Sequence, residues 1–143
     1  GVFPGGRVYF CEHHTPDLVW RPEWQSHGNG IQAIPEFVIA SNDHAGEAET
    51  FAKLLHSDVS GSGDSLSVAI TDAQITVMTP AAYAERYGAL ASPMAGRSSI
   101  FGALVFRTDS LDKIRAAASN TIDEAKRVVV RVSDFDAVLE FVE

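Results

Sequence analysis

The stretch CEHHTPDLVWRPEWQSHGNG, residues 11–30, concentrates the side chains of this sequence that are best suited to chemistry. It contains three of the five histidines, both tryptophans and the only cysteine, a composition that suggests a metal site. Histidine titrates near neutral pH, so His14 and His27 are candidates for catalytic proton transfer or anion binding. The alternative is a structural loop, in which Asn29-Gly30 supplies a left-handed backbone and His27 bonds to the main chain.

Other residues of this stretch favour binding or packing over metal ligation. His13 and His14 are adjacent, and consecutive side chains on a strand point to opposite faces, so they are poorly placed to share a metal. Cys11 is expected as a small buried apolar residue. Trp20 and Trp24 would share one face of a helical turn, where they would either stack on an aromatic ligand or staple a small core. The candidate substrate-binding residues are Trp20, Trp24, Gln25 and Asn29.

Hydrophobic periodicity indicates the elements that must position these residues. Residues 7–13 and 33–41 are rich in aromatic and β-branched side chains, which predicts strands. Asn42 or Asp43 can then cap a helix. The apolar stripe of that helix has helical spacing and consists of Ala48, Phe51, Ala52 and Leu55.

The order of strand, helix and hairpin occurs twice, in residues 33–88 and 99–143. The first copy closes with a short helix that opens at Thr79-Pro80 and ends at Gly88. Residues 89–98 are small, polar and punctuated by Pro and Gly, as in a linker. The helix of the second copy carries an inward stripe formed by Leu111, Ile114, Ala117 and Ala118. We therefore predict an α+β fold of paired β-α-β-β(β) modules forming one curved mixed sheet, a single domain preceded by a strand and loop over 7–30.

Composition limits the partners. The chain has 143 residues and a formal charge of −8, which disfavours nucleic-acid backbones and anionic membrane surfaces. No apolar run approaches the roughly 20 residues that span a bilayer. The lone cysteine is compatible with a reducing cytoplasm, which is the predicted location. We expect a small-molecule ligand and a homodimer, with no nucleic acid and no membrane.

The repeat resembles the vicinal oxygen chelate superfamily, which includes glyoxalase I and the extradiol dioxygenases. Residues 11–30 are similar to a pattern found in glyoxalase-like domain proteins of that superfamily. The matching residues are Cys11, His14, Pro16, Asp17, Trp20, Pro22, Gln25, His27, Asn29 and Gly30. Such proteins often run to twice this length, so the resemblance implies that this chain is the C-terminal half of a longer one.

The resemblance also implies where a metal would bind. In metal-dependent members, the first and last strands of each module point histidine, glutamine or glutamate side chains into a cup. The corresponding positions are Pro35 or Glu36, Gly102, Thr76 and Glu140. Glu140 is the best candidate for ligand or catalytic base and Glu36 for a second carboxylate, whereas Gly102 and Thr76 cannot supply the expected ligands. The sequence is compatible both with a bound divalent Zn, Ni, Mn or Fe ion and with no metal at all.

Three functions follow from the resemblance. The first is an enzyme, of lyase, isomerase or dioxygenase type, that acts on a small oxygenated metabolite, with Glu140, His14 and His27 as candidate catalytic residues. The second is a metal-free binding or sequestration protein whose tryptophans and phenylalanines line an apolar groove. The third is a structural half that completes a dimer or a larger enzyme.

Overall fold

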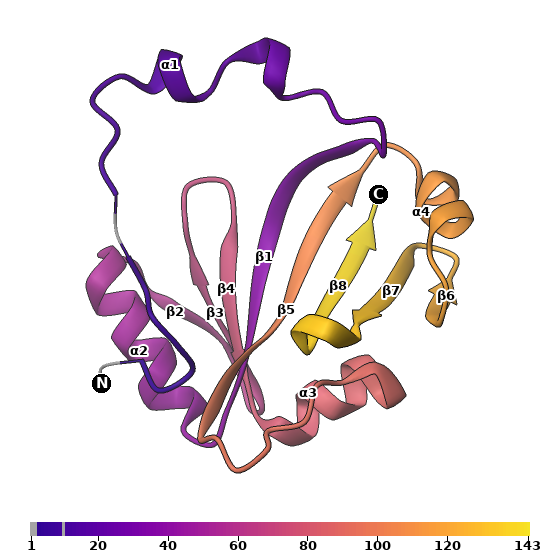
Figure 1. The fold of residues 1–143 in the computed structure, drawn as a ribbon. Helices are drawn as coiled ribbons and strands as arrows, with labels where there is room; N and C mark the ends of the chain where they lie inside the picture. The colour runs from indigo at the N-terminus through magenta and orange to yellow at the C-terminus, as the bar shows by residue number, and fades with distance from the viewer. Residues whose placement is uncertain (1–2, 10) are drawn as a thin grey trace.

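Residues 3–9 and 11–143 are described by a computed structural model of the chain. Within these residues, Figure 1 shows one curved mixed sheet of eight strands in the order β2-β3-β4-β1-β5-β8-β7-β6. The strands are β1 (Ile31–Ser41), β2 (Val59–Ser62), β3 (Ser65–Ala69), β4 (Gln74–Met78), β5 (Ser99–Thr108), β6 (Thr121–Glu124), β7 (Arg127–Val132) and β8 (Ala137–Val142). The helices are α1 (Pro16–Val19), α2 (His44–Leu55), α3 (Pro80–Tyr87) and α4 (Leu111–Ala117), with 3-10 turns η1 (Pro22–Trp24), η2 (Gly88–Leu90) and η3 (Ser133–Phe135).

The sheet consists of two modules with the same connectivity, β1-α2-β2-β3-β4 and β5-α4-β6-β7-β8. In each module the first strand pairs in parallel with the last, β1 with β4 and β5 with β8. The two first strands, β1 and β5, pair antiparallel and join the modules into one sheet. The predicted α+β class and curved mixed sheet are confirmed.

Local sequence signals explain where α2 and α3 begin and end. The Asp43 side chain accepts a hydrogen bond from the Gly46 N–H at 3.1 Å and caps α2. Thr79 does the same for α3, accepting from the Ala82 N–H at 3.2 Å, with Pro80 in the first position. Gly88 ends α3 with a φ of 53°, a conformation that glycine adopts without steric cost.

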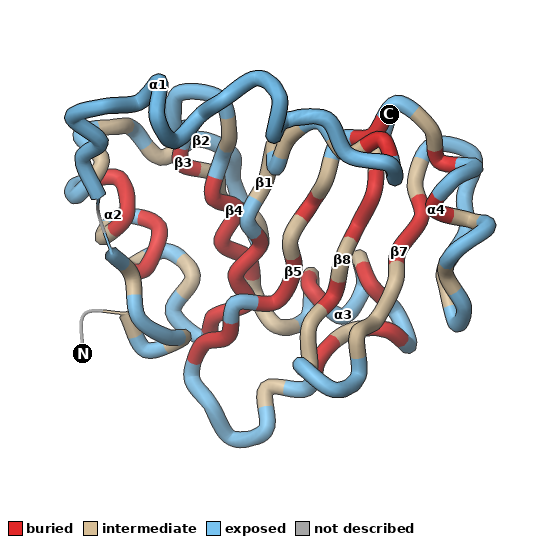
Figure 2. The backbone as a smooth tube through the Cα atoms, turned by 45° about the horizontal axis from the view of Figure 1, so that its top comes forward, coloured by how far each residue is buried: buried red, intermediate tan, exposed pale blue. Residues whose placement is uncertain are grey.

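The helices cover opposite faces of the sheet. On β1, Ile39 packs with α2, while its neighbour Val38 packs with Tyr83 and Tyr87 of α3. On β8, Phe141 packs with α4. Because side chains alternate along a strand, this pairing places α2 and α4 on one face and α3 on the other. Figure 2 shows the buried stretches of β1, β4, β5 and β8 running through the middle of the sheet.

Two edge strands and part of the second helix differ from the prediction. The sequence of β2, VSGS, has weak strand propensity and does not by itself indicate a strand. It becomes a strand by pairing with β3. β6 also becomes a strand by pairing with a neighbour, β7. The stripe of α4 is shorter than expected, because the helix ends at Ala117, which is exposed. The expected linker 89–98 is partly buried, since Leu90 belongs to the core.

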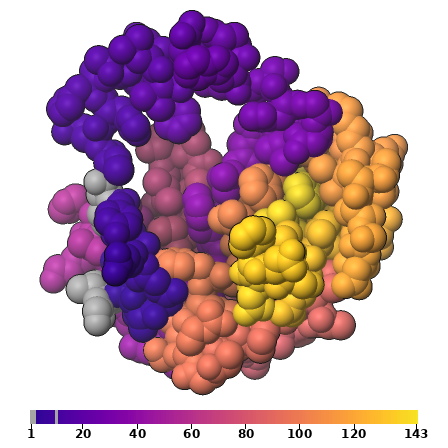
Figure 3. Space-filling view, in the orientation of Figure 1, coloured from indigo at the N-terminus to yellow at the C-terminus, as the bar shows by residue number. Residues whose placement is uncertain are grey.

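The N-terminal arm, which we define as residues 3–9 and 11–29, departs most from the prediction. Residues 7–9 and 11–13 form no strand, and residue 10 lies outside the described residues. Residues 7–9 lie over the face of the sheet, beside side chains of β1 and β5, and pair with none of the described strands. Phe3 anchors the arm at 4.4 Å from the Phe51 ring. Beyond that point α1 and η1 bury no residue, and Figure 3 shows an opening between the arm and the sheet.

None of the helices in the described ranges combines the length and the hydropathy that crossing a membrane would need.

Candidate functional site

The two glutamates singled out by the sequence come from the centre of the sheet. Glu36 on β1 and Glu140 on β8 lie on either side of β5, where Val105 is the register partner of both. All three side chains therefore point to the face that α3 covers. The position expected at Gly102 in the second module is thus taken by Val105. Gly102 instead lies under the Tyr83 ring, where a β-carbon would come within 2.5 Å of a ring atom.

Arg86 on α3 joins the two carboxylates. Its Nη1 donates to Glu36 Oε1 at 2.9 Å and its Nη2 to Glu36 Oε2 at 2.8 Å, a bidentate pair. Its Nε and Nη2 also donate to Glu140 Oε2, at 3.1 and 2.9 Å. The hydroxyl of Tyr87 donates to the same oxygen at 2.9 Å. Arg127 completes this group, which we call the arginine network, with its Nη1 3.6 Å from Glu140 Oε1.

Burial makes the arginine network electrostatically strong. The Glu140 and Glu36 side chains are only 5% and 13% exposed, and Arg86 is 24% exposed. Burial alone would raise the pKa of Glu36, but hydrogen bonds from Arg86 and Thr76 and the Arg86 charge hold it below its ordinary value. Burial raises the pKa of Tyr87 despite the neighbouring Arg86, and Glu140 raises it further, so the hydroxyl stays a neutral donor.

The arginine network does not fit a divalent metal. Arg86 already satisfies both carboxylates as their cation, and Val105 supplies no ligand atom. The neighbouring Thr76 offers only a hydroxyl, which accepts a hydrogen bond from Gln74. Across residues 3–9 and 11–143, no group of three or more His, Cys, Asp or Glu side chains could hold a metal ion. Glu36 and Glu140 are thus brought together as predicted for a metal pair, but by an arginine that already fills the space between them.

The arginine network contains residues that the sequence analysis missed. Tyr83, Arg86 and Tyr87 follow the spacing i, i+3 and i+4 in AAYAERYG and therefore share one face of α3. That spacing could have predicted that one face of the helix carries an arginine and two tyrosines toward the sheet. Arg127 carried no comparable signal.

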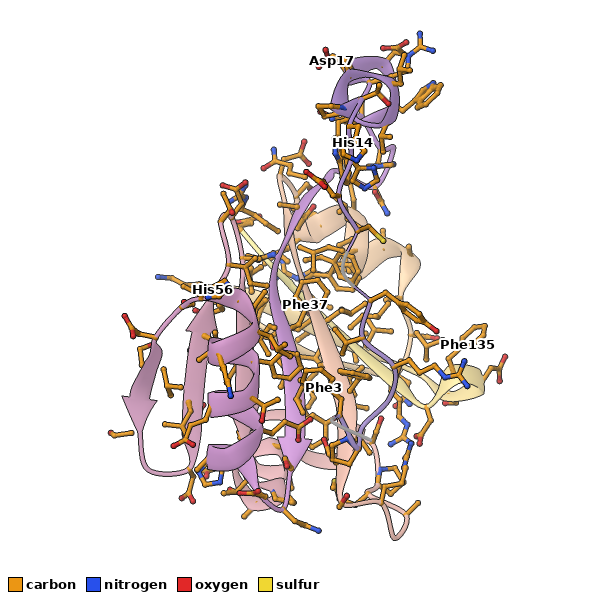
Figure 4. All side chains as sticks on the ribbon, turned by 90° about the vertical axis from the view of Figure 1, so that its left-hand side faces the viewer. Phe3, His14, Asp17, Phe37, His56 and Phe135 are labelled. Atoms are coloured by element: carbon orange, nitrogen blue, oxygen red, sulfur yellow. The ribbon has the colours of Figure 1, made fainter. Side chains whose placement is uncertain are left out.

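The histidines lie elsewhere, on the arm. The His14 side chain is 83% exposed and its Nε2 is 3.7 Å from Glu12 Oε2. Figure 4 shows His14 and Asp17 projecting beyond the sheet, far from Phe37 in its centre. The carbonyl of His27 accepts from the Gly30 N–H at 2.9 Å, and Gly30 has a φ of 76°, the left-handed turn that Asn-Gly suggested. The structure does not bring either histidine to Glu140.

The predicted substrate-binding residues are also on the arm. Trp20 and Trp24 are 61% and 59% exposed, so they do not pack in the core. The Arg21 guanidinium lies 4.7 Å from the centre of the Trp24 ring. Gln25 ends η1, and the Asn29 side chain accepts from the Ile31 N–H at 3.3 Å. Cys11 is exposed, contrary to its expected burial, because the arm packs against nothing at that point.

An apolar groove of about 440 Å³ occupies the opposite face of β1. Glu36 and Phe37 are consecutive and point to opposite faces, so Phe37 lines the groove while Glu36 joins the arginine network. The lining residues are Arg7, Val8, Tyr9, Phe37, Ile39, Phe51, Leu55, Ile70, Ile75 and Phe101. Phenylalanines therefore line a groove as one hypothesis required, but the tryptophans of that hypothesis do not contribute.

Comparison with known proteins supports the fold and little more. The architecture is that of the vicinal oxygen chelate fold, two paired βαβββ modules in one curved sheet. Methylmalonyl-CoA epimerase from Mycobacterium tuberculosis, an enzyme of that superfamily, matches with a TM-score of 0.59. The match has 15% identity and covers 84% of this chain and 93% of the epimerase chain.

A second solved structure, a hypothetical protein from Staphylococcus aureus, matches with a TM-score of 0.48 and 8% identity. The match covers 76% of this chain but only 32% of that protein, so this chain spans about a third of its length. At that level of similarity it carries no argument. No protein-family model and no curated protein sequence matches this chain.

Proposed function

We propose that this chain is a metal-independent binding protein of the vicinal oxygen chelate fold, which holds a small apolar carboxylate in the groove beside β1. The observation that carries the proposal is the groove itself, with partly exposed Phe37 and Phe101 on its floor. Exposed aromatic side chains that gather in a concavity mark a binding site more often than isolated exposed residues do.

The lining of the groove indicates the kind of ligand. Its walls would bury a ring or short acyl chain, and each aromatic contact contributes about 0.5–1.5 kcal/mol. Arg7 is the only charged residue among the described lining residues, so the oxygenated end of the ligand is expected to carry negative charge. The same residues include no carboxylate, histidine, cysteine or serine, which favours binding without turnover.

We expect 2-naphthoate to bind and Phe37→Ser to weaken this binding about tenfold, because the substitution removes one aromatic contact. Isothermal titration calorimetry measures the change. Phe135→Ser is the matched control, since Phe135 is 81% exposed and Figure 4 shows it far from Phe37. Titration with uncharged 2-naphthamide separates the aromatic contribution from that of the Arg7 charge. Arg7→Gln should weaken the binding of 2-naphthoate and leave the binding of 2-naphthamide unchanged. Equal affinity of Phe37→Ser and Phe135→Ser would contradict the proposal, as would turnover of the ligand.

Catalysis by Glu140, His14 or His27 remains a prediction, and so does metal ligation by Glu36 and Glu140. The surroundings of these residues give that prediction less support than the groove gives to binding. Glu140 is already bonded to Arg86 and Tyr87, and the two histidines are not near it.

A second candidate function is self-association through the arm, favoured by its exposed apolar side chains. Leu18, Trp20 and Trp24 are 68%, 61% and 59% exposed, on elements that bury no residue within one copy. Aromatic residues that a monomer leaves in water are enriched at interfaces between chains. A second copy of this chain, related by a two-fold axis, is the simplest partner.

Sedimentation equilibrium should therefore show a dimer that the double variant Trp20→Ser/Trp24→Ser converts to monomer. The intact protein should also show tryptophan emission that shifts to longer wavelength on dilution, as the indoles return to water. Leu54→Ser is the control, because Leu54 is 45% exposed and belongs to α2, not to α1 or η1, which carry the tryptophans or lie next to them. A monomer at every concentration, with emission unchanged by dilution, would contradict association through the arm.

A further inference from the structure

A second, polar cleft of about 230 Å³ lies at the beginning of α2. It shares no lining residue with the apolar groove and none with the arginine network. The cleft is formed by the arm, the turn between β1 and α2, the first turns of α2 and the residue before β5. Its lining residues are Pro4, Ser41, Asn42, Asp43, Gly46, Glu47, Thr50 and Ser98.

Glu47 is the unusual residue of this cleft. It is only 5% exposed, and neither of its carboxylate oxygens has a hydrogen-bond partner among the described residues. A buried carboxylate without a partner is costly, and most buried polar groups in proteins are paired. Glu47 lines the cleft and has no donor among the described residues, which favours a ligand that supplies one.

Three other polar side chains of the cleft are already engaged. Asp43 Oδ1 accepts from the Gly46 N–H at 3.1 Å, and Ser41 Oγ accepts from the Asp43 N–H at 3.1 Å. The Thr50 hydroxyl donates to the Gly46 carbonyl at 2.8 Å. The described lining residues include two acids and no Lys, Arg or His. The described lining of the cleft thus carries two acidic side chains and no basic one, and Glu47 receives no hydrogen bond from it.

We propose that this cleft binds the ammonium group of a small amine, with Glu47 as its counter-ion. An ammonium group carries three N–H donors, and two of them match the two Glu47 oxygens. A volume of 230 Å³ exceeds the needs of a bare ion and leaves space for a short carbon chain. A metal ion fits less well, because within residues 3–9 and 11–143 no third His, Cys, Asp or Glu joins Asp43 and Glu47. This site is independent of the proposed function of the groove.

Thermal unfolding of the intact chain with increasing ethylamine hydrochloride, at ionic strength held constant with NaCl, tests the proposal. Tm should rise and saturate, and calorimetry should give a Kd that Glu47→Gln weakens at least about tenfold, since it removes a charge-assisted hydrogen bond. Glu49→Gln is the matched control, because Glu49 is exposed on the same helix and should leave the Kd unchanged.

The alternatives give different results. A rise in Tm with CaCl₂ or MgCl₂ but not with ethylamine would overturn the proposal in favour of a metal. No saturable effect of either, or an unchanged Kd in Glu47→Gln, would also overturn it. Should Glu47→Gln fail to fold, the side-chain carboxyl carbon of Glu47, observed by NMR in the unmodified protein, must shift on addition of ethylamine. An unchanged chemical shift of the Glu47 carboxyl carbon would also overturn the proposal.

Discussion

Replacing Arg86 by methionine is expected to lower the free energy of unfolding by about 3–5 kcal/mol, the usual cost of removing one partner of a buried ion pair. Methionine keeps much of the volume of arginine but removes the charge and every donor. Glu36 and Glu140 would then remain buried side by side without their bridging cation, with four hydrogen bonds lost. Arg127 would not compensate, because it lies 3.6 Å from Glu140 and is also bonded to Glu124.

Urea unfolding followed by circular dichroism measures this loss. Arg97→Met is the matched control, because Arg97 is 49% exposed and pairs with Asp136 at 3.3 Å, where a surface ion pair contributes about 0–1 kcal/mol. Adding Glu36→Gln and Glu140→Gln to Arg86→Met should recover much of the stability, since no uncompensated carboxylate then remains. A loss below about 1 kcal/mol, or a triple variant no more stable than Arg86→Met, would show that the network contributes little beyond packing.

The fold was predictable because its signals are local. The apolar stripe of α2 and the caps at Asp43 and Thr79 each lie within a few residues of what they determine. Repetition of the pattern then indicated the paired modules. β2 and β6 were missed for the opposite reason, since their sequences are weak strand formers and become ordered by pairing with neighbours. The arm shows the reverse error, because its sequence over 7–13 resembles a strand but residues 7–9 and 11–13 form none.

The candidate site was predictable only in part, because it depends on contacts between distant residues. The resemblance to the superfamily, laid on the strand pattern, indicated Glu36 and Glu140 as candidate carboxylates facing the cup. What lies between them depends on α3, which brings residue 86 to residues 36 and 140. The groove is a similar case, since the exposure of Phe37 depends on how far α2 and the arm extend over β1. Long-range packing therefore decided whether these positions bind a metal, an arginine or a ligand.

The pH dependence of stability is expected to change sign when Arg86 is replaced. In the intact protein the pKa of Glu36 is below its unfolded value of about 4.5. Glu36 therefore contributes stability at pH values above that point, and the contribution is lost as pH falls through the folded pKa. In Arg86→Met, burial becomes the dominant influence and raises the pKa of Glu36. The folded state then binds the proton more tightly than the unfolded state, so acidification from neutral pH should stabilise the variant.

Urea midpoints measured from pH 7 to pH 4 test this reversal. Because the folded pKa of Glu36 lies below about 4.5, the intact protein should keep this contribution down to that pH and lose it only below, whereas Arg86→Met should gain stability relative to it on acidification above that pH. Adding Glu36→Gln to Arg86→Met should remove most of that gain, because the titrating carboxyl is then absent. Glu49→Gln serves as the control for a general effect of removing one acid, since Glu49 is exposed. Parallel pH profiles for the intact protein and Arg86→Met would mean that Arg86 does not set the ionisation of Glu36, and the electrostatic account of the arginine network would fail.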